Sequence, residues 1–160
     1  MGVDGAEPNS VLSVWNDLSK VRELVARESG LAVVIVYRED RSAATSLVNA
    51  GVVEHPVTGQ PVVAYVARGH RRKLRHLRRD PRSTVVIRAG WEWVAVEGNV
   101  ELAGPVDQLD GLDPVELPVL LRSVYAAAVG GDPSEWAALD EAMASEGFTV
   151  VPLRQSGSPR

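Results

Sequence analysis

Five segments between residues 31 and 103 have the composition of β-strands, and one short helix is the only other element expected among them. Most are rich in β-branched and small apolar residues, and turn residues separate them. They cover residues 31–37, 43–49, 61–68, 83–88 and 91–103. Consecutive strands joined by short connections favour an antiparallel sheet. An open sheet of this size would expose its edges, so the pattern predicts closure into a small antiparallel barrel.

Helices are expected around this barrel because apolar residues recur at helical spacing in other parts of the chain. The helical segments cover residues 13–29, 71–79, 114–129 and 135–145, and a final strand is expected over residues 148–153. In the short helix, Leu74 and Leu77 are expected to face inward. The fold class is therefore α+β, an antiparallel β-barrel with flanking helices.

The length of 160 residues fits one domain. We expect that domain over residues 13–153, between a flexible lead at residues 1–12 and a flexible tail at residues 154–160. No apolar run approaches the ~20 residues of a membrane-spanning helix, and no secretory signal is recognisable. Cysteine is absent, which excludes disulfides and cysteine metal sites. These observations predict a cytoplasmic protein without a membrane partner.

Positive charge is concentrated in one segment of an otherwise acidic chain. Eight of the 17 basic residues lie within residues 68–82, together with one of the 21 acidic residues. Helix N-termini bind anions through free N–H groups and a partial positive charge. Arg71, Arg72 and Lys73 would add full charges in the first helical turn. The pattern favours a phosphate site, and the alternative is a solvated helix face paired with acidic residues.

The later arginines of the segment, Arg78, Arg79 and Arg82, lie beyond the first turn, and for them we expect only surface pairing. A nucleic-acid surface is a rival interpretation of the whole segment. The net charge of −4 argues against it, and no aromatic residue within residues 68–82 offers a base a stacking platform. We therefore expect no nucleic-acid partner.

Neither the histidines nor the acidic residues form a recognisable catalytic or metal motif. His55 is expected to be exposed in a loop, and His70 and His76 lie on different faces of the predicted helix. No metal site is predicted, because no HxH or HExxH pattern is present. No protein nucleophile is identifiable, so catalytic residues remain unassigned. If the chain is an enzyme, a cofactor would carry the chemistry.

Trp91 and Trp93 alternate at the start of a predicted strand, so their side chains are expected on the same face. Two planar rings on one face could form the wall of a pocket for a flat ring system. Core packing or a subunit interface is the alternative, and it is the more common role of tryptophan.

Three consecutive stretches together resemble the split β-barrel flavin and deazaflavin reductases, relatives of pyridoxamine 5′-phosphate oxidase. They are KLRHLRRDPR at residues 73–82, TVVI at residues 84–87 and WEWVAVEG at residues 91–98. The resemblance is to the flavin/deazaflavin oxidoreductase B group, whose typical members bind coenzyme F420. It extends from about residue 14 to 153 and is strongest over residues 68–104.

The resemblance implies a homodimer with a cofactor in each of two grooves at the dimer interface. It places the cofactor phosphate against the basic strand-to-helix segment and the ring along the sheet. An aromatic residue, from the same or the partner subunit, would close the pocket. The implied contacts are Arg71, Arg72, Lys73 and His76 for the phosphate, Ser46, Val48 and Val66 for the ring, and Trp91 or Trp93 for closure.

The implied function is an F420-dependent oxidoreductase that transfers a hydride between the deazaflavin and a small planar or conjugated substrate. The basic segment suits the phosphodiester and anionic tail of F420. FMN is the alternative cofactor, because its phosphate would use the same residues. A further alternative is a non-catalytic cofactor-binding or storage protein, since some members of the family bind haem-derived ligands.

Overall fold

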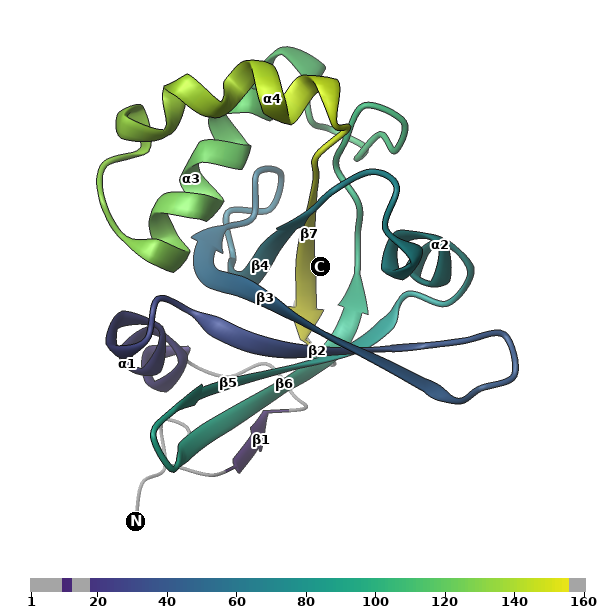
Figure 1. The fold of residues 1–160 in the computed structure, drawn as a ribbon, viewed down its shortest axis with the longest axis vertical. Coiled ribbons are helices and arrows are strands. Elements are labelled where there is room, and N and C mark those ends of the chain that lie inside the picture. The colour runs from purple at the N-terminus through teal and green to yellow at the C-terminus, as the bar shows by residue number, and fades with distance from the viewer. Residues whose placement is uncertain (1–9, 13–17, 156–160) are drawn as a thin grey trace.

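The computed structural model describes residues 10–12 and 18–155, which form seven strands and several helices (Figure 1). The strands are β1 (Ser10–Leu12), β2 (Leu31–Tyr37), β3 (Ala43–Glu54), β4 (Pro61–Ala67), β5 (Arg82–Ala89), β6 (Glu92–Val100) and β7 (Thr149–Gln155). The α-helices are α1 (Ser19–Arg27), α2 (Arg72–Arg79), α3 (Leu117–Val129) and α4 (Asp140–Ser145). Two 3-10 helices, η1 (Pro114–Glu116) and η2 (Pro133–Leu139), precede α3 and α4.

Six strands form the predicted antiparallel barrel, in the order β6-β5-β2-β3-β4-β7. The barrel closes because β7 also pairs with β6, where Val100 lies opposite Leu153. The hairpins β2–β3, β3–β4 and β5–β6 connect strands that are consecutive in the chain, as predicted. The β4–β7 pair joins strands far apart in the sequence. β1 adds to the sheet in parallel with β6, so Ser10–Leu12 lie in a strand within the segment expected as a flexible lead.

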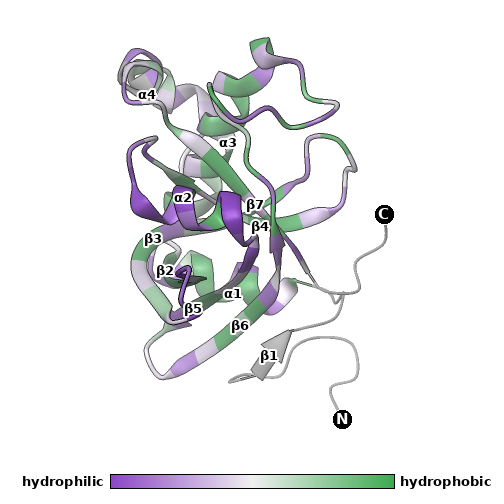
Figure 2. Ribbon diagram, turned by 90° about the vertical axis from the view of Figure 1, so that its right-hand side faces the viewer, coloured by the Kyte–Doolittle hydropathy of each residue, from purple (hydrophilic) through white to green (hydrophobic). Residues whose placement is uncertain are grey.

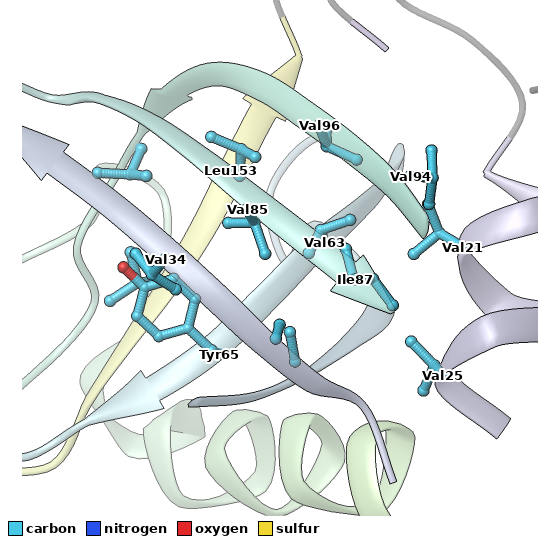
Figure 3. Packing of buried hydrophobic residues seen from close by; sticks show 14 of the residues in the cluster. Val21, Val25, Val34, Val63, Tyr65, Val85, Ile87, Val94, Val96 and Leu153 are labelled. Atoms are coloured by element: carbon cyan, nitrogen blue, oxygen red, sulfur yellow. The ribbon is translucent and has the colours of Figure 1, made fainter. Parts of the chain in front are cut away.

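The core fills the barrel interior with side chains from every wall (Figure 3). Val34, Tyr65, Val85 and Leu153 come from four different strands and are fully buried. Such burial follows from the alternation of side chains along each strand. α3 and α4 lie together above the barrel in Figure 1, whereas α1 lies at its left side, beside β2 and β5. The predicted inward positions of Leu74 and Leu77 on α2 are confirmed.

The largest difference in the elements concerns β3, which runs five residues past its predicted end. Val52 and Val53 continue the ladder with β4 through a segment expected to be a loop. Gly51 stands within the strand because α3 approaches it closely: a Cβ atom there would lie 2.7 Å from the carbonyl carbon of Ala127. The glycine is therefore a packing feature and not a strand end.

The predicted exposure of His55 is wrong, because the side chain is only 2% exposed. Its Nδ1 accepts hydrogen bonds from the backbone N–H groups of Val57 and Thr58, each at 3.2 Å. Its Nε2 lies 2.6 Å from Glu101 Oε1. The imidazole thus fixes the β3–β4 turn from inside, a role that the loop sequence alone does not reveal.

Three other elements begin or end at residues that differ from the predicted bounds. The first begins at Ser19 in the described part, and residues 13–17 of the prediction lie outside it. The 3-10 helix η1 begins before α3. Its start is capped by the Asp113 side chain, which accepts a hydrogen bond from the backbone N–H of Val115, and Pro114 occupies its first position. At the C-terminus, β7 includes residues 154 and 155, which were expected in the tail. Across residues 10–12 and 18–155, no helix has the length and apolar character needed to cross a membrane.

Candidate functional site

The basic segment turns from strand to helix beside the barrel. β4 ends at Ala67, and the chain reaches α2 through Arg71, whose backbone is still extended. Leu74 and Leu77 hold α2 against the core, so its charged residues face outward. Figure 2 shows these hydrophilic residues next to the apolar strands of the barrel. No acidic residue lies in the first turn of α2, and none of the described side chains caps it.

A groove runs along β3 and passes the start of α2. It consists of two adjoining hollows of about 480 and 620 Å³, which share Ser46, Arg71 and Lys73. The first hollow lies between β3, β4 and α3, and the second lies between α2 and the β2–β3 hairpin. Neither hollow is lined by a carboxylate from the described residues. The groove is therefore long, open and positively charged.

The structure brings seven of the nine residues selected from the sequence to this groove. Five of them line the first hollow: Ser46, Val48, Val66, Arg71 and Lys73. The second hollow shares Ser46, Arg71 and Lys73 with the first and is lined in addition by Arg72 and His76. The half-buried side chains of Ser46, Val48 and Val66 lie at the sheet end of the groove. Apolar strand positions and a cationic helix start therefore form one continuous surface.

Trp91 and Trp93 do not line the groove of their own chain. Trp91 occupies the turn before β6 and is 96% exposed, whereas Trp93 lies within β6 opposite Arg88 and is partly buried. β6 begins at Glu92, so the strand contains Trp93 but not Trp91, which was expected to begin it. The β5–β6 hairpin that carries them lies away from α2 (Figure 1).

The cations at the start of α2 differ from those at its end. Arg78 pairs with Asp107 at 2.6 Å, and Arg82 pairs with Asp80 at 2.7 Å, as expected for surface arginines. By contrast, no carboxylate of the described chain lies within ion-pair distance of Arg71, Arg72 or Lys73. The first turn therefore holds positive charge that no described acidic residue neutralises.

Desolvation and the concentrated positive charge lower the pKa of two side chains of α2. Burial lowers the pKa of Lys73, and the positive charge of Arg71 lowers it further. Desolvation lowers the pKa of His76, and four arginines add to this effect, with Arg79 contributing most. Lys73 Nζ also lies 5.5 Å from the ring centre of Tyr65, which adds a cation–π contact. A bound anion would offset the repulsion.

Several groove residues were not predicted from the sequence. Tyr125 and Phe148 come from α3 and from the approach to β7, and both line the first hollow. Tyr125 stacks on Trp136 at a ring distance of 5.7 Å, and the Arg68 guanidinium lies 5.8 Å from the Phe148 ring centre. These residues lie far from the basic segment in the sequence, so only the tertiary fold brings them there.

The described residues contain no group of three His, Asp or Glu side chains that could hold a metal ion. The groove offers an anion site beside a surface of mixed polar and apolar side chains from β3, β4 and α3. Such a combination suits a phosphate-bearing ring compound.

No family model matches the chain. The solved structures described below are at most 15% identical to it. A conserved hypothetical protein from Mycobacterium tuberculosis matches with a TM-score of 0.60 at 15% identity, and the match covers 92% of each chain. A pyridoxamine 5′-phosphate oxidase-related, FMN-binding protein from Nostoc punctiforme matches with a TM-score of 0.59 at 10% identity, over 88% of this chain and 81% of that one.

The heme storage protein HutZ from Vibrio cholerae matches with a TM-score of 0.56 at 8% identity, over 85% of this chain and 87% of that one. The chain spans 55% of the length of an Agrobacterium tumefaciens protein of unknown function, which it matches at 14% identity. At these identities the similarity defines the fold. The chain has the split-barrel fold of pyridoxamine 5′-phosphate oxidase-like, FMN-binding proteins.

Proposed function

We propose that the groove binds a flavin-type cofactor, with its phosphate at the start of α2 and its ring along β3 and β4. The observation that carries the proposal is the charge of Arg71, Arg72 and Lys73, which no described carboxylate pairs, within a groove that also presents the apolar side chains of β3 and β4. Charged hydrogen bonds from arginine and lysine to phosphate are among the strongest available to a protein. The FMN-binding structural neighbour has the same fold, which is consistent with this use of the barrel.

We propose F420 as the cofactor, because the positive surface extends beyond the space that one phosphate needs. Arg38 and Arg75 line the second hollow together with the first turn of α2. A phosphodiester followed by an anionic tail would engage more of these cations than the terminal phosphate of FMN. FMN is the alternative, since its phosphate would contact the same first-turn residues.

The chemistry that a bound deazaflavin supplies is hydride transfer to a small planar or conjugated substrate. The residues of this chain would bind and orient the cofactor. Ser46, Val48 and Val66 would support the ring, and Arg71 and Lys73 would fix the phosphate. No described carboxylate lines the groove, so the contribution of the chain is positioning and stabilisation of negative charge. We therefore propose an oxidoreductase.

A homodimer is part of the proposal, because an exposed apolar face borders the groove. Val33 and Leu47 lie opposite each other on β2 and β3, with 36% and 66% of their surfaces exposed, and Leu31 is 38% exposed on the same face. Leu47 also lines the first hollow. A second copy packed on this face would cover apolar surface and enclose the groove. In that arrangement the exposed Trp91 is available to a partner subunit.

The test is equilibrium binding of F420 to the purified protein and to single variants at the start of α2. Arg71→Ala and Lys73→Ala should each weaken binding by about 1–3 kcal/mol, the scale of a lost charged hydrogen bond. Arg22→Ala is the matched control, because Arg22 is exposed on α1 and does not line the groove. Unchanged affinity in both groove variants would exclude the proposed phosphate position.

A non-catalytic cofactor-binding or storage protein is the second candidate, and a structural neighbour that stores heme gives a specific reason to consider it. Oxidation of reduced F420 by quinones or other conjugated acceptors distinguishes the two functions. Turnover supports the oxidoreductase. Tight binding without oxidation by any acceptor supports storage.

A further inference from the structure

The chain contains two lysines, Lys20 and Lys73, and the structure places them in opposite electrostatic surroundings. Lys20 Nζ lies 2.9 Å from Glu92 Oε2 and 3.2 Å from Glu23 Oε2. These carboxylates raise the pKa of Lys20, and the hydrogen bond to Glu92 contributes most. The amine of Lys20 is therefore held in its protonated, ion-paired form.

Lys73 lines both hollows of the groove, and no carboxylate of the described chain lies within ion-pair distance of it. The other ionisable side chains that line these hollows are five arginines, two histidines and Tyr125. Lys73 is half-buried, and its Nζ lies 5.5 Å from the ring centre of the buried Tyr65. Burial lowers the pKa of Lys73, and Arg71 lowers it further. More of this amine is therefore neutral than in an ordinary surface lysine.

A neutral amine is a nucleophile, whereas an ammonium group is not. Lysines that are desolvated or lie next to another cation are those that form imines with carbonyl compounds. Lys73 meets both conditions, because it is half-buried and Arg71 acts on it. The arginines around it cannot react in this way, since a guanidinium group keeps its proton. Lys73 is thus the one lysine amine that the groove presents.

The cations around Lys73 select the kind of carbonyl compound. Arg71 lines the same two hollows as Lys73, and Arg72 lines the second. Arginine binds phosphate through paired, charged hydrogen bonds. A molecule with a phosphate group and an aldehyde a few atoms apart would be held with its carbonyl carbon close to Lys73 Nζ. Holding two reactants together in this way accelerates their reaction.

We propose that Lys73 forms an imine with small aldehydes that carry a phosphate group. The neutral amine attacks the carbonyl carbon, and a C–N bond forms. The resulting carbinolamine loses the former carbonyl oxygen as water, which takes both amine hydrogens, so the step needs no oxidant or reductant. The adduct would occupy the place proposed for the cofactor phosphate. The inference rests on that part of the proposed function and is independent of which cofactor binds there.

Glycolaldehyde phosphate and glycolaldehyde are the probes, because they differ only in the phosphate group. Cyanoborohydride reduces each imine to a stable secondary amine, and peptide mass spectrometry measures the modified fraction at each lysine. We expect glycolaldehyde phosphate to modify Lys73 about tenfold faster than glycolaldehyde does, the fold-change of one charged hydrogen bond. At Lys20 the phosphate should give no advantage, because Glu23 and Glu92 lie beside it. Equal rates for the two probes at Lys73, or faster modification of Lys20 than of Lys73 by glycolaldehyde phosphate, would overturn the proposal.

Arg71→Ala tests the arginine that lines both hollows with Lys73. The ratio of the two rates at Lys73 should fall several-fold in this variant, because the phosphate loses a partner. The ratio is the readout because it cancels any change in the reactivity of the amine itself. Arg22→Ala is the control and should keep the wild-type ratio, since Arg22 is exposed on α1 and lines neither hollow. An unchanged ratio in Arg71→Ala, or an equal fall in Arg22→Ala, would refute the proposed position of the phosphate.

Binding of F420 to the unmodified protein separates this proposal from the proposed function. Phosphate-dependent modification of Lys73 in a protein that does not bind F420 would support the imine site and reject the cofactor. Binding of F420 without phosphate-dependent modification of Lys73 would retain the cofactor and reject the imine site.

Discussion

At the scale of single residues, the start of α2 combines positive charges that repel one another. Lys73 is partly buried beside Arg71, and His76 is surrounded by arginines on α2 and by Arg38. Both groups have a lowered pKa, so the folded protein resists protonation at these positions. The sequence could predict this cluster because its members are neighbours in the chain. It could not predict the pairing of Arg78 with Asp107, which lies 29 residues further along.

The lowered pKa of His76 predicts a pH dependence of stability. Because the pKa in the folded state lies below the ordinary value of 6.5, the unfolded chain takes up a proton first as the pH falls. The free energy of unfolding should therefore decrease as the pH drops below about 6.5. Chemical denaturation at pH 7.5 and pH 5.5 measures this change, and His76→Gln should reduce it. An identical pH response in the variant would show that other groups cause the decrease.

At the scale of elements, the local pattern predicted most strands, and the tertiary fold determined the rest. The β2–β3 hairpin follows from a β-branched, almost wholly apolar run over residues 31–37, a polar turn and a second strand-like segment. The pairing of β4 with β7, and the closure between Val100 and Leu153, join distant segments that no local pattern connects. The sequence does not predict the extension of β3 past Gly51. A glycine usually indicates the end of a strand, and the packing of α3 on Gly51 is known only from the structure.

The close approach of α3 to β3 predicts that Gly51→Ala is destabilising. Its Cβ would meet backbone atoms of Ala127 and Ala128 at 2.7 Å, and backbone cannot yield as a flexible side chain can. Overpacking of this kind costs about 1–3 kcal/mol. Affinity for F420 should also fall, because α3 carries Tyr125 into the groove. Denaturant unfolding and cofactor binding measure both effects. Glu54→Ala, at an exposed position of the same strand that lines neither hollow, is the control for a substitution in β3, and wild-type stability in Gly51→Ala would contradict the packing account.

At the scale of the whole molecule, the barrel presents an apolar face on β2 and β3 next to a charged groove. The family resemblance implies a homodimer that completes this groove. We propose that its interface includes the exposed pair of Val33 and Leu47. The sequence could not identify this face, because exposure depends on which side of each strand faces the core.

Val33→Glu should convert the proposed dimer to a folded monomer, because a carboxylate would be buried in an apolar contact. Val33 lines neither hollow, so a loss of cofactor affinity in the monomer would show that the second copy completes the site. Light scattering after size-exclusion chromatography measures the mass. Val57→Glu is the control at a second exposed valine, away from this face. A wild-type protein that is already monomeric at micromolar concentration would refute the proposed interface.

The central claim is that the unpaired cations at the start of α2 bind the phosphate and the anionic tail of F420. The most direct measurement is equilibrium binding of F420 and FMN to the purified apo-protein at low and high salt. We predict tighter binding of F420, and a steeper loss of its affinity as the salt concentration rises, because more charges are engaged. Preference for FMN would move the assignment to the flavin-binding alternative, and binding of neither cofactor would contradict the account.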